Sequence, residues 1–563
     1  MTPIRVCLRW MWRLIPGLFI SGFMLGCDKP EAPAQKPESA LSDRVCDMKL
    51  PEATGVQAKC LWYQTNVTAG FSLPAVLFSK THYLADRLLV YIPGGPGSGG
   101  QTSASQMQYW FDWYTDTSIN ADLLIYSPRG TAGSHPHWVC PEYENLSLTV
   151  VAQNISFEQE SRVTRPVLDE CLARYDRRLK SAGNSLGLGV FSSREQARDI
   201  LGMIEQLGYR ESHLWGVSYG SRVALVAAGL AKKIPLPRAT PRTKFASKPN
   251  AAITSLILDS PYPPGRGGLS NWSALRENAL ALHASQYQKL HNVDTQAFYT
   301  LWENAIQKAV SQNEPDYSTL GAGWVFNVSN WYNSEIPPSG MERLAIYTHE
   351  NIGFALNDHR LIALMFFSLY DTAMSHVFYQ VLAEMSDAPL LNENKSAFAS
   401  TQFLLDTFVN SAFEPNFNSL VFYSAECADN QQDTEADYNQ AYVNYPGWAA
   451  YLKTLKKSDI CSGEYFNNLP NLKAGINVSN PTMVIAGTQD HVTPMGWAQA
   501  LVAGPSAANR FLVAVESPHS VLGAGACSSQ LLGFWLEAAE NRTSAAKVQA
   551  AAAQYCNNAE QLK

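Results

Sequence analysis

The chain has 563 residues, more than one ordinary hydrophobic core holds, so we expect either one domain with a large insertion or two domains. Apolar residues make up 46% of the sequence and aromatic residues 11%, which is typical of a globular protein and excludes a disordered chain or a protein with many membrane spans. The formal net charge of −7 argues against nucleic acid as a partner.

The first 27 residues have the pattern of a bacterial export signal. Three arginines precede a 13-residue apolar segment, Leu14–Gly26, which is shorter than the about 20 residues needed to span a bilayer. The segment ends in Met24-Leu25-Gly26-Cys27, which resembles the bacterial lipobox, so we expect a lipid anchor on Cys27. Because Met24 stands where leucine is usual, cleavage by the ordinary signal peptidase, or no cleavage, is the alternative. The expected location is the periplasmic side of a bacterial membrane or the cell surface, or else a soluble periplasmic or secreted form.

Eight cysteines follow Cys27, and an even number in an exported chain is typical of disulfide bonds. They are Cys46, Cys60, Cys140, Cys171, Cys427, Cys461, Cys527 and Cys556. Eight cysteines allow 105 pairings. Their clustering favours the four sequential pairs, and free thiols are the alternative. The cysteines and histidines do not have the spacing of a metal site, so no metal is implied.

The rest of the chain alternates between apolar strand-like runs and amphipathic helices. Residues 28–45 are rich in Pro, Ala, Lys and Glu, and we expect them to form a flexible tether. Strands are predicted at Lys59–Tyr63, Phe71–Phe78, Arg87–Ile92, Ala121–Tyr126, His213–Trp215, Ile253–Leu258, Thr482–Gly487 and Arg510–Val515, and a helix at Ser193–Leu207. This order predicts an α/β fold in which helices cover both faces of a mostly parallel sheet.

The middle third of the sequence differs from the two ends. Over residues 265–471 helical periodicity and aromatic residues replace the strand-like runs. We therefore expect a sheet core built from residues 46–264 and 472–563. The residues between form a mainly helical cap over the carboxyl edge of the sheet, where open α/β sheets bind their ligands.

The pentapeptide Gly216-Val217-Ser218-Tyr219-Gly220 lies between a predicted strand and a helix-compatible run. In this context a Gly-x-Ser-x-Gly sequence holds its serine on a tight turn, with the hydroxyl exposed above the sheet. Ser218 is therefore the candidate nucleophile.

A serine hydroxyl needs a base, and the base needs an acid that fixes its tautomer. Asp490 follows one late predicted strand and His519 follows the next, so both leave the sheet at the same edge as Ser218. The order Ser, Asp, His is the one expected when the nucleophile sits on such a turn. Asp259, which also follows a strand, is the alternative acid.

The negatively charged oxygen formed by attack on a carbonyl needs fixed N–H donors. One is expected from the backbone of Tyr219, directly after the nucleophile. The other is expected from the loop Gly94-Gly95-Pro96-Gly97, and because Pro96 has no N–H we choose Gly95.

Five motifs together resemble the bacterial secreted tripeptidyl aminopeptidases, relatives of prolyl iminopeptidase with the α/β-hydrolase fold and a characteristic C-terminal region. In chain order they are Gly94-Gly95-Pro96-Gly97-Ser98-Gly99, Ser127-Pro128-Arg129-Gly130-Thr131, Gly216-Val217-Ser218-Tyr219-Gly220-Ser221, Leu258-Asp259-Ser260 and Gly487-Thr488-Gln489-Asp490. The resemblance runs from about Cys46 to Cys556. Pro93 stands where prolyl iminopeptidases carry histidine, which favours the tripeptidyl branch.

The resemblance implies a serine exopeptidase that cleaves near the free N-terminus of peptide substrates, with no metal or organic cofactor. Such an enzyme needs carboxylates to hold the substrate ammonium, and Glu426, Asp429 and Glu350 are the candidates. A carboxylesterase or lipase with the same three catalytic residues is the alternative, since the cap chooses the substrate. A non-catalytic surface-binding protein is a third interpretation.

Overall fold

The computed structural model describes most of the chain outside the N-terminal segment. It describes residues 40–47, 55–65, 70–81, 86–231, 252–309, 324–329, 351–387, 399–414, 416–430, 433–466, 472, 478–503, 509–539 and 543–557. All of them belong to one compact unit, Ala40–Lys563. Cys27, Glu350 and the segment 28–39 lie outside the described residues.

Nine described strands form one mixed sheet in the order β1-β2-β3-β5-β4-β6-β7-β10-β11. The strands are β1 Leu41–Asp43, β2 Val56–Gln64, β3 Ser72–Lys80, β4 Arg87–Ile92, β5 Asp122–Tyr126, β6 Glu211–Val217, β7 Ala252–Asp259, β10 Thr482–Gly487 and β11 Arg510–Val515. Pairs from β1 to β5 along this order are antiparallel, and every pair from β5 to β11 is parallel. This arrangement confirms the α/β-hydrolase fold expected from the sequence.

The edge strand β1 lies inside the range expected to be a flexible tether. Leu41–Asp43 pairs antiparallel with β2, and the disulfide Cys46–Cys60 ties the same segment to that strand. The expectation of a tether up to residue 45 is therefore wrong for its last residues. The polar composition of this segment predicts flexibility, because such a segment has little apolar surface to bury. The disulfide holds it against β2 in spite of that composition.

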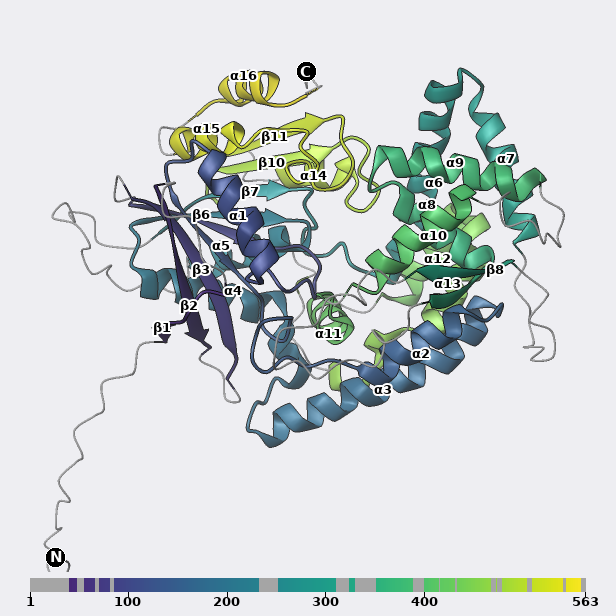
Figure 1. Cartoon of the computed structure of the whole chain (residues 1–563), viewed down its shortest axis with the longest axis horizontal. Helices are drawn as coiled ribbons and strands as arrows, with labels where there is room; N and C mark the ends of the chain where they lie inside the picture. Colours follow the sequence, from purple (N-terminus) through teal and green to yellow (C-terminus); the bar gives the residue numbers. More distant parts are fainter. Residues whose placement is uncertain are drawn as a thin grey trace, which may run out of the picture. The chain divides into compact units, whose positions relative to one another are not determined.

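Helices cover both faces of the sheet (Figure 1). α4 Ser193–Leu207, α5 Tyr219–Ala231 and α14 Met495–Val502 pack their apolar side chains with one face. α1 Ala104–Asp116, α15 Gln530–Ala538 and α16 Ala545–Tyr555 pack with the other. Successive residues of a strand point to opposite faces of the sheet. In β4, Leu88 and Val90 belong to the first core and Leu89 to the second. A strand buried on both faces needs this continuous apolar run.

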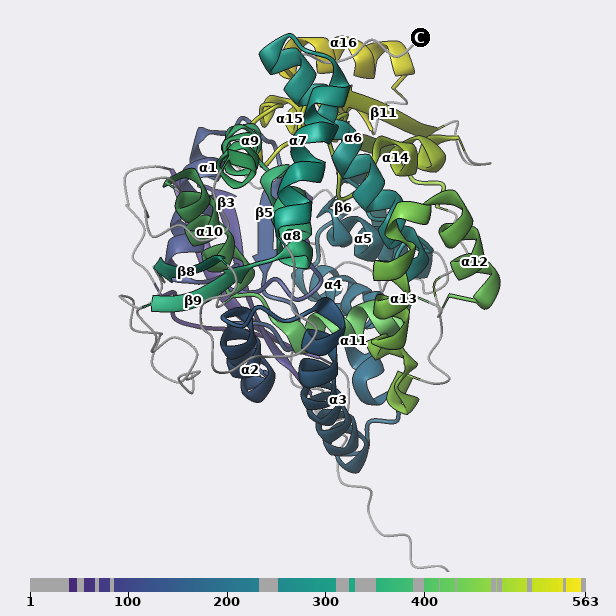
Figure 2. The ribbon, with the colours of Figure 1, turned by 90° about the vertical axis from the view of Figure 1, so that its right-hand side faces the viewer.

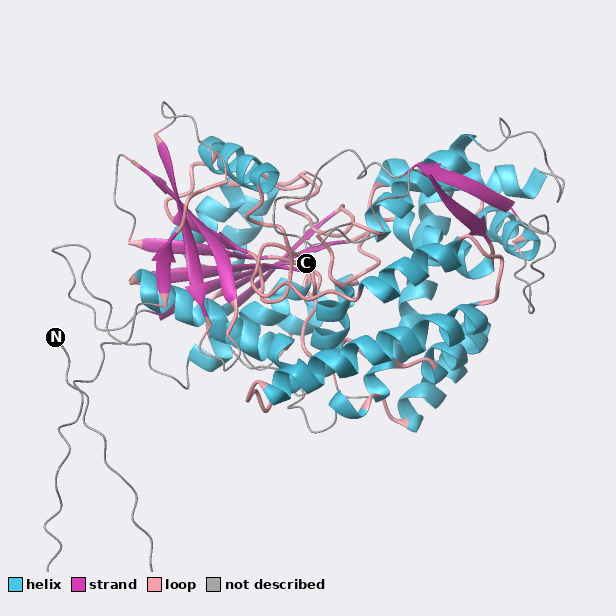
Figure 3. Ribbon diagram, turned by 60° about the horizontal axis from the view of Figure 1, so that its bottom comes forward, coloured by secondary structure: helices cyan, strands magenta, loops and turns pink. Residues whose placement is uncertain are grey.

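The segment between β7 and β10 is mainly helical. It contains α6 Trp272–His291, α7 Thr295–Lys308, α8 Asp358–Ser368, α9 Thr372–Asp387, α10 Ala399–Ala412, α11 Ser419–Asp429, α12 Glu435–Asn444 and α13 Ala449–Lys457. β8 Trp324–Ser329 and β9 Asn351–Leu356 form a separate two-stranded antiparallel sheet there. Figure 2 faces these helices, and Figure 3 shows the small sheet among them. The apolar side chains of α6 to α10 form a core distinct from the two cores on the large sheet, whereas those of α11 belong to the first of these two cores.

Two helices from the first part of the chain join this cap. α2 Pro141–Val151 and α3 Phe157–Ser181 follow β5, and Leu148 and Val151 of α2 belong to the cap core. The buried apolar side chains of α3 belong to the first core on the large sheet, but its Glu160 accepts a hydrogen bond from Arg360 of the cap at 2.8 Å. The buried Arg360 of α8 donates hydrogen bonds to the carbonyl oxygens of Val150 and Val151 at 3.0 and 2.7 Å. The cap is therefore built from two excursions of the chain and not only from residues 265–471.

Four disulfides connect the sequential cysteine pairs Cys46–Cys60, Cys140–Cys171, Cys427–Cys461 and Cys527–Cys556. This is the pairing that the clustering favours, and it is typical of proteins that fold in an oxidising compartment. Among the helices of the described ranges, none combines the length and the hydropathy needed to cross a membrane.

Candidate active site

Ser218 occupies the turn between β6 and α5 with a φ of 52°, in the left-handed region that side chains rarely adopt. The flanking glycines make this turn possible. A Cβ at Gly216 would lie 2.4 Å from the carbonyl oxygen of Gly220, and a Cβ at Gly220 would lie 2.2 Å from the carbonyl oxygen of Ile92. The Gly-x-Ser-x-Gly spacing is therefore a steric requirement of the turn that presents Ser218.

Asp490 and His519 are joined by a hydrogen bond of 2.8 Å between Nδ1 of the imidazole and Oδ2 of the carboxylate. Asp490 follows β10 and His519 follows β11, and these strands are parallel neighbours. The other carboxylate oxygen of Asp490 accepts the N–H groups of Val492 and Thr493 at 2.9 and 2.8 Å. The Thr493 hydroxyl donates to Oδ2 at 2.7 Å. The carboxylate is thus held in one orientation toward the imidazole.

The charges of this pair reinforce one another. Burial favours a protonated Asp490, but the adjacent imidazolium and the donors from Thr493 outweigh it and lower the pKa of Asp490 below its usual value. Burial also disfavours a charged His519, yet the Asp490 carboxylate outweighs this and raises the pKa of His519. A base of this kind takes up a proton more readily than a free imidazole.

Asp259, the alternative acid, has a different set of partners. Its carboxylate accepts the backbone N–H groups of Val521 and Leu522 at 2.9 and 3.0 Å. Complete burial raises the pKa of Asp259 to about 6, although these N–H donors work in the opposite direction. Asp259 therefore holds the segment after His519 in place, and Asp490 is the acid that accepts the hydrogen bond from the imidazole.

Ser218 and His519 line one cavity of about 900 Å³, near the upper end of the range for small-molecule sites. The cavity lies between the carboxyl ends of the strands and the cap. Its wall includes Gly94, Gly95, Tyr262, Trp272, Arg276, Phe366, Tyr370, Glu426, Asp433, Asp459 and Trp497. Nucleophile, base and glycine loop thus meet at the same space.

The expected oxyanion donors lie next to Ser218. Gly95 lines the cavity and has a φ of +113°, a backbone conformation that glycine adopts without strain. Its neighbour Gly94 lies close to the Ser218 side chain. α5 begins at Tyr219, so the N–H of Tyr219 belongs to the first turn, where helix N–H groups have no partner within the helix. The phenol of Tyr219 points elsewhere and bonds Ser193 at 2.9 Å.

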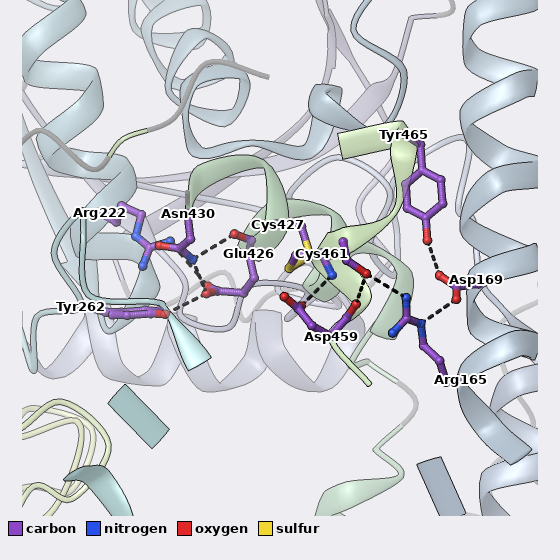
Figure 4. The surroundings of a disulfide bond; sticks show 11 residues. Arg165, Asp169, Arg222, Tyr262, Glu426, Cys427, Asn430, Asp459, Cys461 and Tyr465 are labelled. Atoms are coloured by element: carbon purple, nitrogen blue, oxygen red, sulfur yellow. Dashed lines mark hydrogen bonds and ion pairs between the residues drawn. A yellow bond between two sulfur atoms is a disulfide. The ribbon is translucent and has the colours of Figure 1, made fainter. Parts of the chain in front are cut away.

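The three candidate carboxylates for a substrate ammonium have different positions. Glu426 lines the cavity and accepts hydrogen bonds from the Tyr262 hydroxyl at 2.7 Å and the Asn430 amide at 2.8 Å (Figure 4). Asp429 is 1% exposed and is not among the described residues of the cavity wall. Glu350 lies outside the described residues. Glu426 is therefore the candidate that the structure brings to the cavity.

Arg222 of α5 connects these acids to the nucleophile's helix. Its completely buried guanidinium lies 3.5 Å from Glu426 and 3.4 Å from Asp429, and 4.0 Å above the ring of Tyr262. The three groups carry a net charge of −1 only when both carboxylates are ionised, and burial raises the pKa of Asp429. Burial raises the pKa of Glu426, against the opposing effect of Arg222. A cation that binds in the cavity beside Glu426 would favour the ionised form of this carboxylate over the protonated form.

Sequence patterns do not single out Arg222, Arg276, Tyr262 or Thr493. They lie within helices or loops and belong to no motif, although Thr493 follows Asp490 at the spacing of a side-chain turn. His491, adjacent to Asp490, is buried against Phe366 and has no hydrogen-bond partner among the described residues. Burial lowers its pKa to about 3, so it is neutral at physiological pH.

Comparison with known proteins gives a likeness in fold. No protein-family model matches this sequence, and no curated protein is significantly similar to it. Among solved structures, it is similar to an α/β-hydrolase, GrgF, from Penicillium sp. sh18, with 13% identity over 86% of this chain and 98% of that chain and a TM-score of 0.30. It is similar to a putative aryl esterase from Burkholderia cenocepacia, with 11% identity over 85% of this chain and 100% of that chain and a TM-score of 0.31. A bromoperoxidase from Bacillus anthracis shows 10% identity over 85% of this chain and 99% of that chain, with a TM-score of 0.32. At these values the likeness carries no argument about activity.

Proposed function

We propose that this protein is a serine hydrolase in which Ser218 attacks a carbonyl carbon and forms an acyl-enzyme. The observation that carries the proposal is that Ser218 and His519 line the same cavity and that Nδ1 of His519 is hydrogen-bonded to Asp490. With Nδ1 bound, Nε2 is the nitrogen that takes the proton of Ser218 and passes it to the leaving group. Water then attacks the acyl carbon with the help of the same nitrogen, and the backbone N–H groups of Tyr219 and Gly95 bind the oxyanion.

A fluorophosphonate probe tests this chemistry without knowledge of the substrate. The purified protein is expected to be labelled at Ser218, and Ser218→Ala is expected to remain unlabelled while keeping the circular dichroism spectrum of the wild type. If the wild type itself resists the probe, a non-catalytic binding protein is the better interpretation.

Among serine hydrolases, we propose that this protein is an aminopeptidase that cleaves near the free N-terminus of peptides. It is supported by Glu426 on the cavity wall and by the grouping of two carboxylates, Glu426 and Asp429, around the one guanidinium of Arg222. An ammonium group in a largely dry site needs a carboxylate to replace its hydration. The substrate's amino end would therefore bind beside Glu426 and Tyr262.

Peptidyl anilides with a free or an acetylated N-terminus test the aminopeptidase proposal. The free form is expected to be hydrolysed at least roughly tenfold faster in kcat/KM, since a charged hydrogen bond contributes about 1.5–3 kcal/mol. Glu426→Gln is expected to lose most of this preference by raising KM. Equal hydrolysis of both forms would contradict amino-end recognition.

An esterase is the second candidate. The aromatic side chains of the cavity wall, among them Trp272, Phe366 and Trp497, suit a neutral acyl group. Faster hydrolysis of neutral acyl esters than of any free-amine anilide would favour this activity, and labelling of Ser218 would be the same in both cases.

We also propose that the protein is exported and anchored through Cys27. The four disulfides support an oxidising compartment. Replacing Cys27 by alanine is expected to move the protein from the membrane fraction to the soluble fraction. Mass spectrometry of the wild type should find an acylated N-terminal cysteine.

A further inference from the structure

Arg276 carries a positive charge that no described residue of the protein neutralises. It extends from α6 into the cavity wall. Its guanidinium lies 3.7 Å above the ring of Phe366 and 5.0 Å from that of Trp272, and it has no hydrogen bond or ion pair with any of the described residues. Its Nε is buried without a partner.

This arrangement is unusual for a charged group. Burial lowers the pKa of Arg276 to about 10, so the group keeps its charge at neutral pH in a site that disfavours charge. Arg129, elsewhere in the fold, shows the ordinary arrangement, because its buried guanidinium is paired with the carboxylate of Asp199. The rings around Arg276 supply no anion, and neither does any other described residue, so an anionic group of a bound ligand could pair with it.

The position of Arg276 in the cavity differs from that of Glu426. Phe366, which packs on Arg276, lies 4.4 Å from His491, and Tyr370 lies 4.9 Å from His491 and 5.9 Å from His519 between ring centres. Arg276 therefore belongs to the part of the wall next to the base. Glu426 belongs to the part formed by α11 and Tyr262. The cavity offers a carboxylate at one place and a guanidinium at another.

We propose that Arg276 binds the terminal carboxylate of a short peptide whose amino end is held at Glu426. The proposal rests on the aminopeptidase function proposed above and specifies its substrate class. Because the acyl part of the substrate carries the amino end, the carboxylate belongs to the fragment that leaves with the proton from His519. The planar guanidinium presents paired N–H donors that match a carboxylate. The flanking rings of Phe366 and Trp272 suit an apolar side chain beside it.

A ladder of alanine peptides tests the proposal on the full-length protein. Tri-, tetra- and pentaalanine are compared with their C-terminal amides, and the products are measured by mass spectrometry. The wild type is expected to prefer the free acid of the best length by roughly 10- to 100-fold in kcat/KM. Arg276→Gln should bring the acid-to-amide ratio close to one, chiefly through KM, and Arg276→Lys should retain part of the preference.

Lys289→Gln is the matched control, because it removes one positive charge from the same helix at an exposed site outside the described cavity wall. It is expected to keep the wild-type ratio. Equal turnover of acid and amide by the wild type, or an unchanged ratio in Arg276→Gln, would overturn the proposal. N-acetyltetraalanine tests the proposed aminopeptidase function separately from the role of Arg276. If it is cleaved as fast as tetraalanine, the protein does not recognise the amino end of its substrate, whatever the acid-to-amide ratio shows. If Arg276→Gln does not fold, the wild-type ratio and Arg276→Lys decide the question.

Discussion

At the scale of single residues, the site depends on which protonation state each buried group holds. In the proposed mechanism His519 must be neutral to accept the proton of Ser218. Burial lowers the pKa of His519, but the Asp490 carboxylate outweighs burial and raises this pKa above the ordinary value of about 6.5. Activity is therefore lost as pH falls through this raised pKa, so the acid limb of the pH profile should lie above that of free imidazole.

Asp490→Asn tests this assignment. Without the carboxylate, burial lowers the pKa of His519 and only the smaller effect of Asp259 opposes it, so the acid limb should move to lower pH. The rate should fall by roughly 10⁴-fold, because the amide no longer favours the tautomer with Nε2 unprotonated. The measurement is kcat/KM against pH for an ester substrate, and an acid limb that stays in place would contradict the role of Asp490.

Asp259→Asn separates the two acids near His519. An asparagine can accept the N–H of Val521 or of Leu522 but turns an amide donor toward the other, which leaves a buried group unsatisfied at a cost of about 1–3 kcal/mol. We expect lower stability in urea denaturation and a reduced kcat. The acid limb should stay near that of the wild type, because Asp490 still faces the imidazole.

At the scale of elements, the helix that follows the nucleophile is tied to the cap by charge. Arg222 of α5 meets Glu426 and Asp429 of α11, and the backbone N–H of Ser193, at the start of α4, donates to Asp429 at 2.9 Å. The start of α11 is also fixed to the core, since the Asn418 side chain donates to the carbonyl oxygen of Gly130 at 2.8 Å. Glu426 of α11 thus keeps a constant position relative to Ser218.

Arg222→Ala should break this connection. It leaves two buried carboxylates without their cation, so the free energy of unfolding should fall by about 3–5 kcal/mol. Arg162→Ala is the comparison, because its ion pair with Glu158 is exposed and should contribute less than about 1 kcal/mol. Urea denaturation of both variants measures the difference, and equal losses would show that the buried cluster is not stabilising α5 against α11.

At the scale of the whole molecule, disulfides hold both the sheet edge and the cavity wall. The bond Cys427–Cys461 spans 34 residues, follows Glu426 directly and reaches the cavity through Cys461 (Figure 4). The bond Cys46–Cys60 spans 14 residues and lies at the β1–β2 edge. The two bonds therefore stabilise different parts of the fold.

Paired serine replacements distinguish these roles. Removing Cys427–Cys461 should lower stability by roughly 3–4 kcal/mol, and removing Cys46–Cys60 by about 3 kcal/mol. The first should also raise KM for substrates with a free amino group, because Glu426 loses its anchor. The second should change the melting temperature alone. A KM that changes equally in both would mean that the cap bond does not position Glu426.

The sequence by itself determined the α/β-hydrolase fold and the choice of Ser218, Asp490 and His519 as candidates. Apolar strand runs, glycines beside a serine and polar residues at strand ends are local signals, and parallel strands bring their carboxyl ends to one edge whatever the cap does. Only the tertiary structure decided that α2 and α3 join the cap. It also decided that Glu426 and not Asp429 lines the cavity, and that Arg276 lies there without an ion pair to any residue that the structure describes. These outcomes depend on which helix faces pack together across hundreds of residues, and an amphipathic pattern shows that a face is buried without showing what covers it.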